Sequence, residues 1–200
     1  MINLVSYKDS DHSYSVEGTS VPSMTQLMEY TGVIKKSDWE IPEKYAIRGT
    51  EIHAMTELVD LGLFDPFLCS DSAYPFIMQY ERFLEENEVE ILESETIVFN
   101  DKLFYAGRKD RLCLLNGKRT LLDIKSGAKA RWHVVQLAGY AQGDCEQLVD
   151  LYLQPFDYKI HIWKDSEREE AEQVLEAMSK CYYFSHPRDY KKLLKIKEKV

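Results

Sequence analysis

The sequence has few cysteines, no long hydrophobic run and no internal repeat, and these absences exclude several classes of protein. Its four cysteines are scattered without a Cys-x-x-Cys pair, so we expect neither a cysteine zinc site nor an iron–sulfur cluster. No apolar stretch approaches the roughly 20 residues that span a bilayer, so we expect no membrane contact. Residues 1–10 include Lys8 and Asp9, so we expect no signal peptide and a cytoplasmic protein with reduced cysteines.

Positive charge is also scarce, because 34 acidic residues outnumber 25 basic ones and the net charge is −9. Nucleic-acid-binding proteins usually carry a basic surface, so the overall charge argues against that class. Two observations weaken this objection. A bound cation offsets the carboxylates that hold it. The basic residues also gather in three segments, which are 108–111, 125–133 and the tail at 191–199.

The pattern of apolar residues predicts an α/β or α+β protein with a mixed sheet. Since linkers and low-complexity segments are absent, we expect one domain over residues 1–200. It comprises an N-terminal hairpin and short helix over 1–40, a core over 41–164 and a helical region over 165–200. Helices are expected at 24–30, 40–61, 73–87, 131–145 and from 166 onward, with a break at Pro187. Strands are expected at 12–21 (a hairpin), 90–99, 103–115, 120–125, 148–156 and 158–163.

A carboxylate and an amine end the short apolar strand at 120–125. Because side chains alternate along a strand, Asp123 and Lys125 share one face, and Ile124 points to the other. Alone, such a pair is typical of a partly exposed ion pair at a strand end.

The Asn116-Gly117 dipeptide predicts a tight hairpin that changes this interpretation. Asp110 lies six residues before Asn116, and Asp123 lies six residues after Gly117, so the two aspartates are expected to be cross-strand neighbours. Two carboxylates placed opposite one another repel. A divalent cation between them relieves the repulsion, and Mg²⁺ prefers such oxygen ligands. The backbone carbonyl of Ile124 is a further candidate ligand.

Two helices contribute weaker signals. Gly49, His53 and Glu57 are spaced by four on the helix at 40–61, so His53 can offer a ring nitrogen to a metal, although a lone helical histidine is more often structural. Gln136 and Tyr140 share the same spacing on the next helix, where an ordinary amphipathic helix is the simpler interpretation.

In this order, four segments resemble the RecB-nuclease-like branch of the PD-(D/E)xK nuclease superfamily, and in particular its phage-type exonucleases. The segments are 48–53, 106–110, 122–127 and 136–140, and the resemblance covers about residues 12–163. It implies a restriction-endonuclease-like core with a central mixed β-sheet flanked by helices. It also implies a Mg²⁺- or Mn²⁺-dependent deoxyribonuclease that acts on DNA ends in recombination or repair, in a bacterial or phage-infected cell.

The resemblance also implies roles for individual residues. His53, Asp110, Asp123 and the Ile124 carbonyl would hold the metal, and Lys125 would act on the attacking water and the charged transition state. Glu95 matches an upstream glutamate of the family, with Glu93 as a rival. The candidates for contact with DNA, or for bracing the site, are Gln136, Tyr140, Arg48, Lys129 and Arg131. Trp132, Tyr105 and Phe104 are candidates for stacking on bases, although large aromatics near strands more often belong to the core.

Several alternatives stay open at this point. The same fold can support a structure-specific or general endonuclease instead of an exonuclease. The chain can also be a DNA-binding subunit with a vestigial nuclease site, or an acidic scaffold whose motif matches arise by chance. The scattered cysteines favour the family members without an iron–sulfur cluster, and a strand-annealing or recombination protein is the partner that the resemblance implies.

Overall fold

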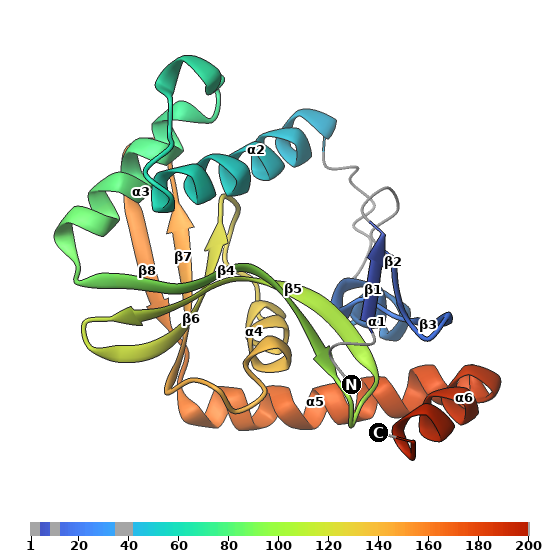
Figure 1. The fold of residues 1–200 in the computed structure, drawn as a ribbon. Helices are drawn as coiled ribbons and strands as arrows, with labels where there is room; N and C mark the ends of the chain where they lie inside the picture. The colour runs from blue at the N-terminus through green and yellow to red at the C-terminus, as the bar shows by residue number, and fades with distance from the viewer. Residues whose placement is uncertain (1–4, 9–12, 35–41, 200) are drawn as a thin grey trace.

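A five-stranded mixed sheet with helices on both faces forms the centre of the molecule (Figure 1). The computed structural model describes residues 5–8, 13–34 and 42–199. The strand order is β4 (Val89–Asn100), β5 (Tyr105–Leu115), β6 (Lys118–Lys125), β7 (Gln147–Leu153) and β8 (Tyr158–Ile162). Only the β6–β7 pair is parallel, and helix α4 (His133–Ala141) lies in the connection between these two strands. The α/β class and the mixed sheet predicted from the sequence are confirmed.

The hairpin between β5 and β6 follows from its turn residues. Asn116 and Gly117 both have positive φ angles, of 51° and 78°, which the tight turn of a two-residue hairpin requires. Leu115 pairs with Lys118, and the register continues without a shift to the pair Arg111–Leu122. The predicted hairpin and its register are therefore confirmed.

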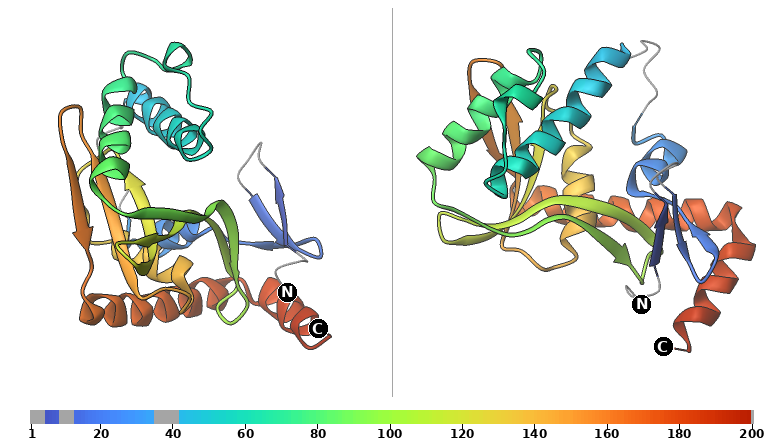
Figure 2. Two further views of the ribbon diagram at one scale, coloured as in Figure 1. Left: turned by 60° about the vertical axis from the view of Figure 1, so that its left-hand side comes forward. Right: turned by 45° about the horizontal axis from the view of Figure 1, so that its top comes forward.

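The two faces of the central sheet carry separate hydrophobic cores (Figure 2). Helices α2 (Glu43–Asp60) and α3 (Tyr74–Glu86) cover one face, where the buried apolar side chains of β6 and β7 include Leu122, Ile124, Val149 and Leu151. Helices α4 and α5 (Asp165–Ser185) cover the other, over Leu121 and Leu148. The alternation of neighbouring leucines between the two cores is the period expected of strands.

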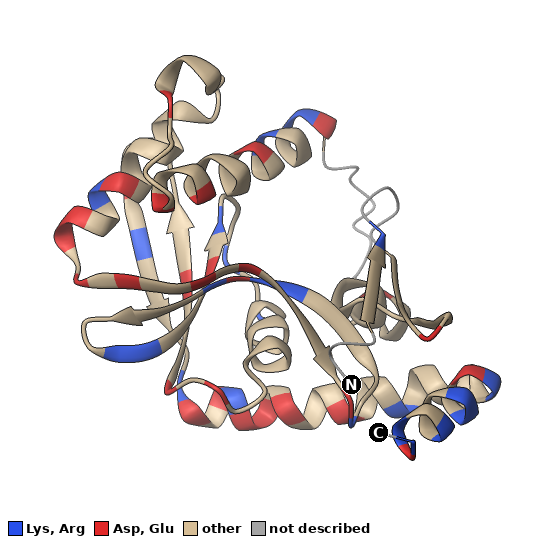
Figure 3. Cartoon of the chain, in the orientation of Figure 1, with Lys and Arg blue, Asp and Glu red and all other residues tan. Residues whose placement is uncertain are grey.

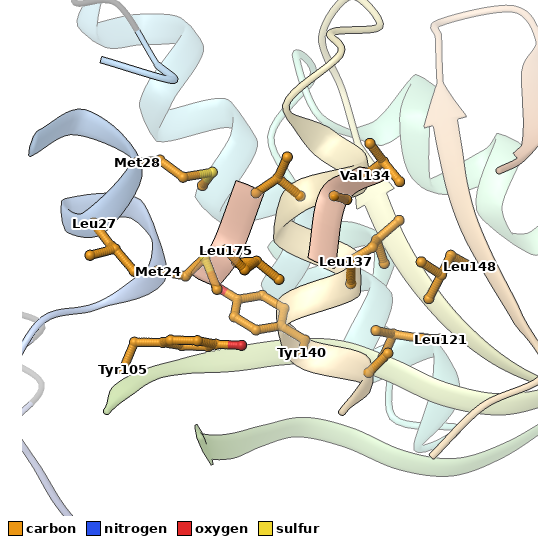
Figure 4. Close-up of a cluster of buried hydrophobic side chains, with 14 of the residues drawn as sticks. Met24, Leu27, Met28, Tyr105, Leu121, Val134, Leu137, Tyr140, Leu148 and Leu175 are labelled. Carbon is orange, nitrogen blue, oxygen red and sulfur yellow. The ribbon is translucent and has the colours of Figure 1, made fainter. Parts of the chain in front are cut away.

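The α4 core also contains helix α1 (Met24–Thr31), and Figure 4 shows Met24, Tyr105 and Leu175 gathered around Tyr140 of α4. Ser23 caps α1 by accepting a hydrogen bond from the Gln26 amide. The glycine at position 107 of β5 leaves the space that the Tyr140 ring occupies, since a Cβ atom there would lie 2.4 Å from Tyr140 Cε1. Helix α4 therefore approaches β5 closely.

A smaller three-stranded antiparallel sheet precedes α1. It consists of β1 (Val5–Lys8), β2 (Ser13–Val16) and β3 (Thr19–Val21), and its apolar side packs against helix α6 (Pro187–Lys197). The predicted hairpin is confirmed over residues 13–21, and its expected start at residue 12 lies outside the described residues. Strand β1 was not predicted, because four residues give too short a pattern.

Other boundaries differ from the prediction in local detail. Helix α4 ends at Ala141 rather than residue 145, because Gln142 and Gly143 adopt positive φ angles. The expected start of α2 at residue 40 lies outside the described residues. A short 3₁₀ turn, η3 (Pro66–Leu68), forms in the segment between α2 and α3. The break at Pro187 is confirmed. Among the described residues, no helix combines the length and apolar character needed to cross a membrane.

Candidate metal centre

Four carboxylates occupy one row across the central sheet, one on each of four neighbouring strands. Glu95 of β4 and Asp110 of β5 lie between the paired positions 94–111 and 96–109. Asp110 of β5 and Asp123 of β6 lie opposite one another, one position beyond the pair Arg111–Leu122. Asp123 is in turn paired with Asp150 of β7. Like charges placed opposite one another on neighbouring strands destabilise a sheet, so this row requires positive charge nearby.

One group in this row has the composition of a metal site. His53 of α2, Glu95 and Asp110 each offer a ligand atom, and these atoms lie within 4.8 Å of one another. His53 Nδ1 lies 3.3 Å from Asp110 Oδ2. Two carboxylates and one imidazole can ligate a divalent cation, and this donor set does not select one metal. The predicted Mg²⁺ or Mn²⁺ stays a prediction.

Glu95, rather than its rival Glu93, lies in this group. Glu93 instead pairs with Lys109, with its carboxylate 2.7 Å from Nζ. A β-bulge between Ile91 and Glu93 shifts the register of β4, and Glu95 itself has a positive φ of 48°. Burial and the neighbouring Asp110 raise the pKa of Glu95, against the opposing effect of Arg111 and His53.

A cavity of about 500 Å³ opens onto the group from the α2 side. Its lining includes His53, Glu95, Gly49, Tyr45 and Arg108. A Cβ atom added to Gly49 would have one neighbour, Ser126 Oγ at 3.8 Å, so the space beside this glycine is largely open. A phosphate entering this cavity would meet Arg108 beside the carboxylates.

Asp123 and Lys125 lie on the other side of Asp110. Lys125 Nζ contacts Asp123 Oδ2 and donates a hydrogen bond to Gln136 Oε1 at 2.9 Å. Asp110 Oδ2 accepts a hydrogen bond from the Ile124 amide at 2.8 Å, so Asp110 joins the two halves of the site. Asp123 is not in the His53 group, and its predicted role as a shared ligand, like that of the Ile124 carbonyl, stays a prediction.

Asp123 is buried and Lys125 is partly buried, and burial affects the pKa of both residues. Burial raises the pKa of Asp123, as do Asp110 and Asp150, while Lys125 opposes the rise. Burial alone would lower the pKa of Lys125, but the three aspartates outweigh it and the pKa is raised. Lys125 is therefore held in its protonated form.

Asp150 is a buried carboxylate that the sequence analysis missed. Its side chain is fully buried, and Oδ2 accepts hydrogen bonds from Trp163 Nε1 at 2.8 Å and from Tyr152 Oη at 3.0 Å. His133 Nδ1 lies 2.7 Å from the same tyrosine oxygen. The available signal was a single acidic residue inside the apolar strand 148–153.

A second missed group surrounds Arg111, which is also fully buried. Its Nε donates to Asp60 of α2, and its Nη1 donates to Glu95 Oε1 at 3.1 Å and to the Asp110 carbonyl at 2.8 Å. Tyr80 Oη donates to the other oxygen of Asp60 at 2.6 Å. Arg111 thus orients Glu95 and the backbone beside Asp110.

Two of the three basic residues in the segment 108–111 do not contribute to a basic surface. Arg111 is fully buried and Lys109 is 7% exposed, because both charges are paired inside the fold. Arg108 remains half-buried at the cavity. The basic tail forms α6, where Figure 3 shows Lys and Arg gathered.

The two residues predicted on α4 face the protein interior. Gln136 accepts the hydrogen bond from Lys125, and Tyr140 is buried against Gly107. From the sequence, these residues have two candidate roles, contact with DNA and bracing of the site. Their positions agree with bracing. The buried ring of Tyr140 is not placed for direct contact with DNA.

The three basic candidates have different environments. Arg48 is half-buried, with its guanidinium over the rings of Phe76 and Tyr45. Lys129 is exposed, and Arg131 is exposed and paired with Glu170 at 2.7 Å. Lys129 and Arg131 are thus the two that solvent reaches freely.

Neither the family models nor the curated proteins searched give a match to this sequence.

Proposed function

We propose that the protein is a Mg²⁺- or Mn²⁺-dependent deoxyribonuclease of the PD-(D/E)xK type. The observation that carries this proposal is the position of Asp110, between the His53–Glu95 group and the Asp123–Lys125 pair. A set of metal ligands next to a partly buried lysine can supply both the activated water and the positive charge that promote phosphodiester hydrolysis.

The residues divide the chemistry between them. His53, Glu95 and Asp110 would hold the cation, with Asp123 as a further candidate ligand. When bound, a divalent cation lowers the pKa of water and withdraws charge from a phosphoryl oxygen. Lys125 is protonated and points at the carboxylate row, so its Nζ can donate to a phosphate oxygen as negative charge develops there. Gln136 limits the orientation of that amine.

We further propose DNA ends as the substrate, with an internal cut as the alternative. The test uses single- and double-stranded DNA labelled at the 5′ or 3′ end, and covalently closed circles, each with Mg²⁺ or Mn²⁺. Shortening of labelled linear DNA without loss of circles is the expected result. Rapid loss of circles would instead establish an endonuclease, and an absence of cleavage of every substrate would contradict a nuclease.

Two variants assign the chemistry to the site. Asp110→Asn should reduce cleavage to background, because it removes the ligand that joins the two halves. Lys125→Met should lower the rate by about 10²–10³-fold, as does the removal of one transition-state donor in other enzymes. The exposed Asp71→Asn is the matched control and should cleave at the wild-type rate. Wild-type cleavage by Asp110→Asn, with circular dichroism showing folded protein, would refute the assignment.

A further inference from the structure

A second cavity, of about 700 Å³, opens beside the start of α4. It lies between the segment 129–132, α4 and α5, and its lining includes Lys129, Trp132, Val135, Trp163, Ala171 and Val174. Cavities of this size commonly receive small organic groups. It shares no residue with the lining of the cavity at the metal centre.

The two indole rings give this cavity its chemical character. Trp132 is partly buried and Trp163 is 6% exposed, with its Nε1 already donated to Asp150. The hydrogen-bonding edge of Trp163 is therefore turned to the interior. What the two tryptophans offer a ligand is ring surface, which is the surface on which nucleic-acid bases stack.

The cavity also adjoins the candidate catalytic lysine. Lys125 Nζ lies 5.6 Å from the centroid of the Trp132 ring, and the same amine contacts Asp123. A planar group stacked on Trp132 would thus lie one side chain away from the carboxylate row. Of the three aromatics considered for stacking from the sequence, Tyr105 and Phe104 are each 1% exposed and belong to the core.

The cavity lining carries two basic and two acidic side chains, which are Lys129, Arg131, Glu167 and Glu170. Glu170 binds Arg131, whereas Glu167 accepts from the uncharged Lys164 amide and keeps its negative charge. Lys129 Nζ lies 4.6 Å from the Trp163 ring centroid, and within the described part of the chain no carboxylate pairs with it. Lys129 is therefore the basic side chain of the lining that is available to a phosphate.

We infer that this cavity receives one unpaired base of a single-stranded DNA end, with Trp132 as the stacking surface and Lys129 as the contact for a neighbouring phosphate. The inference rests on the proposed nuclease function and adds to it a substrate preference. A base within a duplex is paired and stacked on both sides, so it reaches a pocket only when the strand is single or the base is flipped out. Single strands are accordingly the favoured substrate.

Binding is measured by fluorescence anisotropy of a labelled 12-nucleotide oligo(dT) in EDTA, where no cleavage occurs. Trp132→Ala should weaken binding about 5–150-fold, the range that corresponds to the loss of one stacked base. Trp132→Phe should keep most of the affinity but reduce the quenching of tryptophan fluorescence on binding, because Trp163 remains in the cavity. Lys129→Ala should weaken binding and reduce the slope of affinity against salt by about one phosphate contact.

The matched control removes another exposed aromatic. Phe156, in the turn between β7 and β8, is 91% exposed, and Phe156→Ala should bind like wild type. Binding by Trp132→Ala and Lys129→Ala within twofold of wild type would overturn the pocket, as would equal wild-type affinity for the oligonucleotide and a blunt duplex. Failure of the proposed function looks different, because the wild type would then bind and be quenched without cleaving any substrate.

Discussion

Two groups of charged side chains meet at Asp110, and they differ in how their charge is balanced. On one side, the cation of Arg111 faces Asp60 and Glu95, and the hydroxyls of Thr56 and Tyr80 complete the hydrogen bonds. On the other side, the carboxylate row places four acids beside one lysine and two histidines, which are Lys125, His53 and His133. Glu95 belongs to both groups.

This difference in charge balance suggests a structural role for the Arg111 group and a binding role for the carboxylate row. A buried ion pair with all its hydrogen bonds made needs nothing further, so the Arg111 group fixes the position of β5 against α2. A buried excess of carboxylates is unfavourable until a cation binds. The same fold thus contains one group whose charge is balanced and one with an excess of carboxylates, which a bound cation would balance.

Replacing Arg111 by methionine should have the largest effect on stability. The change leaves Asp60 buried without a cation, and removing one member of a buried ion pair typically costs about 3–5 kcal/mol. Urea denaturation measures the free energy of unfolding. The double variant Arg111→Met with Asp60→Leu should recover part of the loss, because the charge of Asp60 is then removed together with its partner, while Glu95 still lacks its bond to Arg111. A loss below about 1 kcal/mol in the single variant would show that the pair behaves like an exposed one.

The dependence of metal binding on pH should give an intermediate effect. The pKa of Asp123 is raised to about 7, so its protonated form favours the folded state, and this contribution is lost as the pH rises through that value. Without metal, the protein should therefore melt at a lower temperature at pH 8 than at pH 6. Since metal ligands must be deprotonated, Mn²⁺ should raise Tm more at pH 8 than at pH 6.

Differential scanning fluorimetry with Mn²⁺ or EDTA measures this difference directly. Asp110→Asn should show no Mn²⁺-dependent rise at either pH. An equal rise at both pH values in the wild type would mean that no proton is displaced, and it would count against a site built on carboxylates of raised pKa.

The exposed pair of Arg131 and Glu170 should give the smallest effect. Both side chains are more than half exposed, and their guanidinium–carboxylate distance is 2.7 Å. Exposed pairs of this kind contribute about 0–1 kcal/mol, so Arg131→Ala should change the free energy of unfolding by less than about 1 kcal/mol. A larger loss in the same urea titration would indicate that burial is not what distinguishes this pair from Arg111 and Asp60.

The parts of the site that local chemistry determines could be predicted from the sequence. Asn116 and Gly117 fix a two-residue turn, the turn fixes the register, and the register places Asp110 beside Asp123. The spacing of His53 on α2 likewise predicts a helical face. These inferences needed only neighbouring residues and the periods of strands and helices.

The remaining parts depend on contacts between distant segments. Arg111 and Asp60 are 51 positions apart, and each resembles an ordinary surface charge in the sequence. The choice between Glu93 and Glu95 depends on a bulge that no local pattern announces. The burial of Asp150 depends on α4 and α5, which supply His133 and cover Trp163.

The absence of a side chain at position 107 sets the thickness of one layer of the molecule. The Tyr140 ring fills the space above Gly107, and one helical turn earlier Gln136 accepts the hydrogen bond from Lys125. Alanine at 107 would place a methyl group 2.4–2.8 Å from the ring, which forces α4 outward and draws Gln136 Oε1 away from Nζ. The spacing between helix and sheet thereby sets the position of the Gln136 amide relative to the Lys125 amine, through a glycine that lies against the Tyr140 ring.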